Sequence, residues 1–172
     1  MIRKIGALAG AAAGFFFFLS SAYAVDGVAV EVGHGDNSTS LLRFAITDSW
    51  RKRAPATREW RLAGYWEFSA GVWDNKDEST ADIGITPVFR FEHNAAYLEA
   101  AIGVRLVTTH ISAQRTFSTA FQFGDHLGAG IRFGPQDRYD FGLRVQHISN
   151  GGIRSPNPGI NFFIVRLQYD LE

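Results

Sequence analysis

The sequence contains no cysteine, which excludes a disulfide scaffold, a thiolate metal site and a cysteine nucleophile. Proline is scarce, with 5 residues in 172, and only 20% of the residues are charged, so the composition argues against a disordered chain. Basic and acidic residues balance at 17 each, which gives no reason to expect a nucleic-acid partner. Aromatic residues are plentiful, at 14%, and the length suits one domain.

The first 24 residues predict a secretory signal peptide. Arg3 and Lys4 form a basic start, residues 5–19 are apolar, and the segment ends at Ala24 with small residues at the Ala-x-Ala spacing. The alternative is a membrane anchor, but the apolar stretch is short for a bilayer-spanning helix and a cleavage-like site follows it. We therefore expect a mature domain of residues 25–172 in the periplasm or the outer membrane.

The mature chain alternates with period 2 nearly throughout. It has no apolar run of about 18 residues, and so no candidate transmembrane helix. Segments of alternating apolar residues are instead separated by turn-forming residues, which is typical of β-strands. Eight such segments predict eight strands, over residues 28–33, 42–47, 60–68, 83–91, 98–106, 121–133, 139–146 and 163–171.

The face opposite the apolar one is rich in charge. Its charged residues are Glu31, Arg43, Arg61, Glu67, Asp82, Arg90, Glu99, Arg105, Arg132, Asp140, Arg144 and Arg166. A soluble β-sandwich gives the same alternation, with the apolar face buried and the polar face wet. In a membrane barrel the apolar face meets lipid, and the charged residues pair across the lumen.

Three features favour the barrel over the sandwich: the even number of strands, the aromatic residues near strand ends, and a last strand that alternates to the C-terminus. We therefore expect an all-β fold, an eight-stranded antiparallel transmembrane β-barrel of the bacterial outer membrane. With the N-terminus on the periplasmic side, the periplasmic turns are residues 51–57, 93–96 and 134–138. The outward loops are then residues 35–39, 73–80, 109–116 and 150–160.

Polar residues interrupt the predicted lipid-facing row at the outer end of the last two strands. His147 and Ser149 continue the row of Val145, and Asn161 shares the side of Phe163 across the loop. Residues i and i+2 of a strand share a face, roughly 6.5–7 Å apart along it. A histidine there can take the proton of a serine and make it a nucleophile. The alternative is that these residues only lie at the membrane interface, where polar side chains are tolerated.

The loop that follows is suited to stabilising an oxyanion. Residues 150–159 combine glycines with two asparagines, so backbone N–H groups and carboxamides are available as donors.

At these residues the chain resembles the PagL family, the lipid A 3-O-deacylases. The resemblance rests on His147-x-Ser149-Asn150, on Gly151-Gly152 and on Asn157-Pro158-Gly159. It implies an outer-membrane barrel with a serine esterase site on its lipid-facing exterior, acting on lipid A of lipopolysaccharide in the outer leaflet. That chemistry requires no metal and no organic cofactor. By position, the resemblance implies Ser149 as nucleophile, His147 as base, Asn161 as third member, and Asn150, Gly152 and Asn157 as oxyanion donors.

One position departs from the expected pattern, because Asn161 stands where a known member of the family has a glutamate as third triad residue; either the family tolerates asparagine here or another carboxylate serves. An amide can orient a histidine but carries no charge to stabilise imidazolium, and in one serine triad such a replacement cost about 10⁴-fold. A second candidate is Asp125, which interrupts the lipid-facing row of the sixth strand. If Phe133 pairs with Tyr139 across the preceding turn, Asp125 lies directly opposite His147.

Three other functions remain open from sequence alone: a structural or adhesive outer-membrane barrel, a phospholipase or acyltransferase barrel, and a soluble lipocalin-like binder. The remaining histidines show no metal-ligand spacing, and His126 in particular is expected in the lumen. The oligomeric state is open between a monomer and a homodimer.

Overall fold

The structure is a computed structural model, and it describes residues 25–51, 58–75, 79–108, 110–112 and 115–171. The predicted signal segment, residues 1–24, and most of the predicted turn at 51–57 lie outside the described residues. Among the residues described, no helix combines the length and the apolar content needed to cross a membrane.

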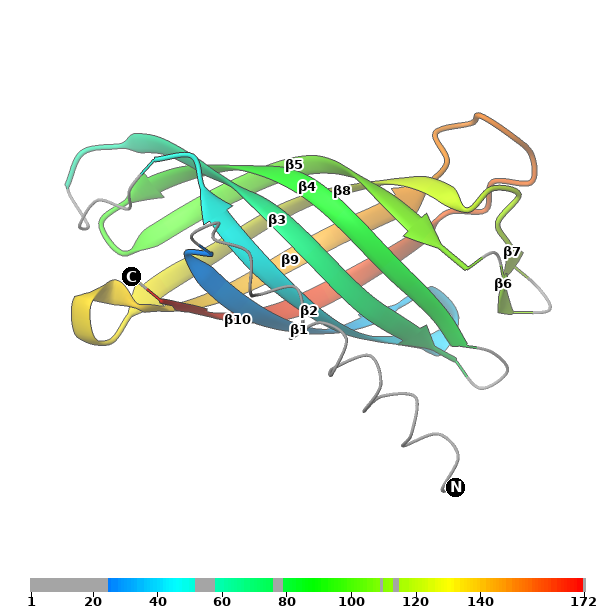
Figure 1. Ribbon diagram of the computed structural model, residues 1–172, viewed down its shortest axis with the longest axis horizontal. Coiled ribbons are helices and arrows are strands. Elements are labelled where there is room, and N and C mark those ends of the chain that lie inside the picture. The colour runs from blue at the N-terminus through cyan, green and yellow to red at the C-terminus, as the bar shows by residue number, and fades with distance from the viewer. Residues whose placement is uncertain (1–24, 52–57, 76–78, 109, 113–114, 172) are drawn as a thin grey trace, which may run out of the picture.

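Eight strands of the described chain close into an antiparallel barrel, as predicted, with β1 paired to β10 (Figure 1). The strands are β1 (Gly27–Gly35), β2 (Thr39–Ser49), β3 (Arg61–Asp74), β4 (Ser79–His93), β5 (Ala96–Val107), β8 (Phe121–Phe133), β9 (Tyr139–Ser149) and β10 (Ile160–Asp170). The short strands β6 (His110–Ser112) and β7 (Arg115–Thr116) form a separate hairpin in the loop before β8. Two 3₁₀ turns, η2 (Asp36–Ser38) and η3 (Pro135–Asp137), connect β1 to β2 and β8 to β9.

The β9–β10 connection and the β6–β7 hairpin lie at one end of the barrel, called here the site end; η3 and the end of β10 lie at the other (Figure 1). β3 and β4 extend further toward the site end than the sequence pattern predicts, and β4 also extends two residues further at the opposite end. They have 14 and 15 residues because their backbones stay paired from Arg61–Glu92 to Asp74–Ser79, beyond the segment where apolar residues alternate.

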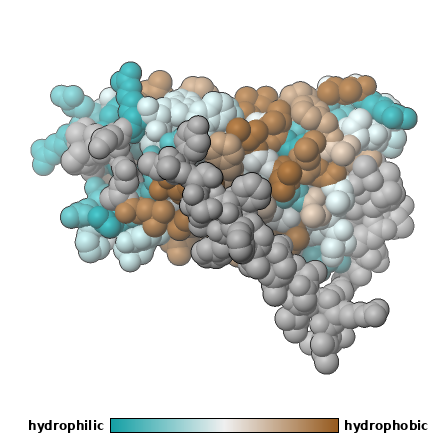
Figure 2. All heavy atoms as spheres, in the orientation of Figure 1, coloured by the Kyte–Doolittle hydropathy of each residue, from teal (hydrophilic) through white to brown (hydrophobic). Residues whose placement is uncertain are grey.

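The outer wall is apolar, as the alternation predicts. Side chains at alternate strand positions are exposed, among them Leu62 and Leu127, each 69% exposed. On the face drawn in Figure 2, apolar residues gather over the middle of the wall and hydrophilic ones mainly toward its ends. A continuous apolar surface of this extent is unfavourable in water and marks a contact with lipid.

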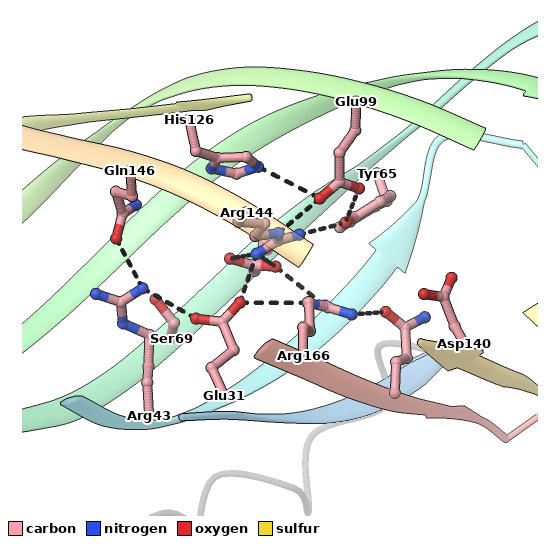
Figure 3. A network of polar contacts seen from close by, with 12 residues as sticks. Glu31, Arg43, Tyr65, Ser69, Glu99, His126, Asp140, Arg144, Gln146 and Arg166 are labelled. Atoms are coloured by element: carbon pink, nitrogen blue, oxygen red, sulfur yellow. Dashed lines mark hydrogen bonds and ion pairs between the residues drawn. The ribbon is translucent and has the colours of Figure 1, made fainter. Parts of the chain in front are cut away.

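The lumen is filled in its middle by an ionic network. All the charged residues predicted for this face are buried except Arg61, which pairs with Glu92 near the barrel mouth. Arg144 lies at the centre (Figure 3): Nε is 2.6 Å from Glu99 Oε1, Nη1 is 2.5 Å from Glu31 Oε1, and Nη2 donates to Tyr65 Oη at 2.8 Å. His126 lies here too, buried and 3.6 Å from Glu99. Buried charges are tolerated here because each meets partners of opposite sign.

Near the site end the lumen is apolar instead, which the sequence pattern did not predict. We call this cluster the plug; its members are Leu41, Trp73, Val107, Phe117, Ile148, Ile160, Phe162 and Ile164. The Trp73 ring lies 5.3 Å from that of Phe162 between centroids. Because Ile148 and Ile160 are fully buried, the residues beside them in β9 and β10 are held facing outward on a rigid wall.

Candidate active site

The structure brings three of the predicted residues together on the outer wall, at the site end of β9 and β10. His147 and Asn161 are directly paired across the two strands. His147 and Ser149 are half-buried and Asn161 is exposed, in a row whose alternate neighbours face the plug. All three side chains therefore lie on the lipid-facing side of the barrel, as their position in the alternation predicts.

The imidazole of His147 forms a hydrogen bond with the side chain of Asn161. His147 Nδ1 lies 2.8 Å from Asn161 Oδ1. A carboxamide oxygen only accepts hydrogen bonds, so with this contact Nδ1 carries the proton and Nε2 carries the lone pair. This tautomer is the one that can take a proton from a hydroxyl group at Nε2.

Asp125 lies directly opposite His147 on β8, which confirms the predicted register. Its side chain is exposed, and in the described part of the chain no hydrogen bond or ion pair joins it to the imidazole. Of the two candidates for orienting His147, the contact geometry favours Asn161.

Asn161 is in turn held by Asp36, a contact that sequence reasoning missed. Asp36 Oδ2 accepts hydrogen bonds from Asn161 Nδ2 and from the Asn161 backbone N–H, each at 3.1 Å. The two residues are 125 positions apart. Closure of the barrel could have indicated this contact. Pairing the first strand with the last puts Gly35 opposite Phe162, and so places the turn after Gly35 beside the start of β10.

The hydroxyl of Ser149 points toward the loop rather than toward His147. Ser149 Oγ lies 3.5 Å from the backbone N–H of Gly151, and within the described residues it forms no hydrogen bond to the imidazole. Bonds between a nucleophile and its base are commonly long without substrate and form in the substrate complex. The shared face of the strand leaves the two groups on the same side, as that chemistry requires.

The loop after β9 is built around Asn150, which is fully buried. Its Nδ2 donates to Arg154 O at 2.7 Å and to Ser118 Oγ at 3.1 Å, and its Oδ1 accepts from the Gly152 N–H at 2.9 Å. Its own backbone N–H donates to Asn157 Oδ1 at 3.0 Å. The side chain of Asn150 and the N–H of Gly152 thus both support the loop.

Asn157 differs from the other two predicted oxyanion donors, Asn150 and Gly152, because its side-chain N–H groups are not engaged by these bonds. The Oδ1 of Asn157 is engaged by Asn150, so its Nδ2 points to the other side of the amide. Within the described chain, this Nδ2 is the carboxamide donor that the loop's own hydrogen bonds do not use. Asn157 therefore retains a carboxamide donor for a ligand without any change in the loop's own hydrogen bonds.

Gly159 brings the loop against the imidazole. Its φ is +60°, and a Cβ added there would lie 2.7 Å from His147 Cε1 and 3.3 Å from Nε2. Only glycine allows the backbone to approach the ring this closely in a left-handed conformation.

As for metal ligands, no group of three or more His, Asp or Glu side chains in the described part of the chain is arranged to hold an ion.

Comparison with known proteins relates the chain to a family. The sequence model described as "Lipid A 3-O-deacylase (PagL)" matches residues 41–170. The chain is 30% identical over 168 residues to Lipid A deacylase PagL of Pseudomonas aeruginosa, covering 94% of this chain and 95% of that protein. It is 37% identical over 114 residues to Lipid A deacylase PagL of Bordetella bronchiseptica, covering 64% of this chain and 58% of that protein. Among solved structures, the crystal structure of the outer membrane enzyme PagL matches with a TM-score of 0.73 and 26% identity, covering 83% of this chain and 98% of that one.

Proposed function

The chain belongs to the lipid A 3-O-deacylase (PagL) family, and from that membership we propose that it is an integral outer-membrane hydrolase that removes the ester-linked acyl chain at the 3-position of lipid A. The observation that carries the proposal is the pair of His147 and Ser149 on the lipid-facing wall. A site on this wall faces the ester groups of neighbouring lipids directly, so the substrate does not have to enter the barrel lumen.

The nucleophile of the proposed reaction is Ser149. Its Oγ attacks the ester carbonyl carbon while His147 Nε2 accepts the hydroxyl proton, which is needed because a neutral serine is a weak nucleophile. Asn161 holds the proton-bearing Nδ1 side of the ring through the 2.8 Å contact. The carbonyl oxygen becomes an oxyanion, which we assign to Asn157 Nδ2, because the donors of Asn150 and the N–H of Gly152 are engaged in the loop's own hydrogen bonds.

The second half of the reaction returns the protein to its starting state. The tetrahedral intermediate collapses, the carbon–oxygen bond to the 3-hydroxyl of the sugar breaks, and that oxygen takes the proton from His147. Water then attacks the acyl-serine ester and gives one proton to His147. Collapse of this second intermediate releases the fatty acid and returns the proton to Ser149 Oγ.

His147, Ser149 and Asn161 all come from one barrel. A homodimer, which the sequence leaves open, is therefore not required for the proposed reaction.

The test is to express the full chain, or its Ser149→Ala variant, in a Gram-negative host and to weigh the extracted lipid A by mass spectrometry. We expect loss of one 3-linked hydroxyacyl chain with the wild type and none with the variant, since removing a triad nucleophile costs at least about 10³-fold. Heat-modifiable migration in gels serves as the control that both barrels are folded.

The other outcomes separate the competing functions. Unchanged lipid A with altered phospholipids would indicate a phospholipase or acyltransferase on the same wall. No lipid change with either folded protein would indicate a structural barrel and would refute the proposed hydrolase.

A further inference from the structure

The amide of Asn161 poses a problem of direction that a carboxylate would not. A carboxylate presents only acceptors to a histidine, whereas a carboxamide has an acceptor at one end and a donor at the other, in nearly the same shape. If the amide of Asn161 were turned over, its Nδ2 would donate to Nδ1 of His147 and the ring proton would move to Nε2. A ring protonated at Nε2 cannot take the proton of Ser149.

Asp36 removes this ambiguity. Its Oδ2 accepts from Asn161 Nδ2 at 3.1 Å, and a carboxylate cannot donate, so it selects the orientation in which Oδ1 faces His147. We infer that Asp36 is a positioning residue for the hydrolase proposed above, one that fixes the tautomer of His147 through the amide of Asn161 and supplies the negative charge that Asn161 lacks. The inference therefore rests on the proposed function.

The turn that carries Asp36 is built to reach this position. A Cβ on Gly35 would lie 2.7 Å from Asn161 O and 2.6 Å from the Phe162 ring, so glycine is needed for the turn to approach the start of β10. Thr39 Oγ1 donates to Asp36 O at 2.7 Å and holds the turn from its other side. The second bond runs from the Asn161 backbone N–H to the same Oδ2. Because this donor belongs to the backbone of β10, it fixes the position of the carboxylate relative to the strand itself.

The charge also contributes to the reaction itself. When His147 accepts the serine proton it becomes an imidazolium, and its Nδ1–H bond to Asn161 strengthens. The amide passes part of this polarisation to Asp36, because hydrogen bonds in a chain strengthen one another. The arrangement replaces one direct carboxylate with an amide and a carboxylate in series.

The first measurement is hydrolysis of purified lipid A with an intact 3-linked acyl chain, in mixed micelles, by the full chain and its variants. Asp36→Asn keeps the size of the side chain but can donate as well as accept, so we expect kcat to fall about 10- to 100-fold with KM little changed. Asp137→Asn is the matched control, since it removes the same charge from a 3₁₀ turn, η3, at the opposite end of the barrel. It should change kcat less than about twofold.

The second measurement separates positioning from folding. In an Asn161→Glu background the introduced carboxylate contacts His147 directly and repels Asp36, so the same Asp36→Asn substitution should raise kcat instead of lowering it. A fall of similar size in both backgrounds would overturn the inference, because a merely structural residue acts in one direction. Asp36→Asn activity within twofold of the wild type would overturn it as well.

A third measurement does not depend on activity. Nitrogen-15 NMR of histidine-labelled protein distinguishes a ring protonated at Nδ1 from one protonated at Nε2, and the His147 signals are assigned by their loss in His147→Gln. We expect the Nδ1–H form in the wild type and a mixture in Asp36→Asn. An unchanged tautomer in Asp36→Asn would refute the positioning role. Failure of the proposed function looks different: the wild type and Ser149→Ala would both leave lipid A intact, whatever the tautomer.

Discussion

Replacing Gly159 with alanine should inactivate the site without unfolding the barrel. The added Cβ would lie 2.7 Å from His147 Cε1, whereas carbon atoms in contact normally lie 3.5–4.0 Å apart, so the ring must retreat by about 1 Å. A displacement of about 1 Å at a reacting group costs on the order of 10²-fold. The left-handed φ of +60° adds a backbone cost of about 1–2 kcal/mol.

The assay is kcat/KM on lipid A in mixed micelles, and we expect a loss of about 100-fold in Gly159→Ala. Gly134→Ala is the matched control: its φ is also positive, at +78°, and its Cβ would lie 2.6 Å from Tyr139 Cδ2, so it combines backbone strain with a similar collision at the other end of the barrel. It should lower stability while leaving activity close to that of the wild type. Retention of more than about half the activity in Gly159→Ala, or an equal loss in Gly134→Ala, would refute the reasoning.

Two further predictions concern stability, measured by urea unfolding of the barrel in lipid vesicles. Arg144→Met should cost about 3–5 kcal/mol, because it leaves buried carboxylates short of one positive charge, and adding Glu67→Gln should restore part of the loss; a double variant less stable than the single one would contradict this. Leu127→Arg, in the middle of the outer wall, should cost about 2–4 kcal/mol, but Leu171→Arg, just beyond β10, only about 0–1 kcal/mol. Equal costs at the two positions would argue against a lipid-facing wall.

The barrel could be predicted from sequence because lipid imposes one strict rule on every strand. Alternate residues must be apolar, so period 2 locates the eight strands, and a short turn between Phe133 and Tyr139 suffices to set the β8–β9 register. The plug could not be predicted in this way. Trp73 and Phe162 occupy positions that belong to the charged face, and no local pattern distinguishes a lumen position near the middle from one near the end.

The site was predictable to the extent that it lies on one face of two strands. His147, Ser149 and Asn161 share that face through simple alternation, and the structure brings them together. The hydrogen bonds of Asn150 depend on how a ten-residue loop folds back, which residue types alone do not specify. The contact of Asp36 with Asn161 depends on the pairing of the first and last strands, and therefore on closure of the whole sheet.

The position of the site on the outer wall has a consequence for how its rate is measured. Under the proposed function, substrate arrives by lateral diffusion in two dimensions, and the fatty acid and the shortened lipid leave by the same route. The concentration that governs turnover is thus the mole fraction of substrate in the membrane or micelle, and adding inert detergent at constant bulk molarity slows the reaction by surface dilution. Because His147 and Ser149 lie only half-buried on that wall, the proposed reaction relies on the surrounding lipid for the low-dielectric enclosure that a soluble enzyme builds from its own side chains.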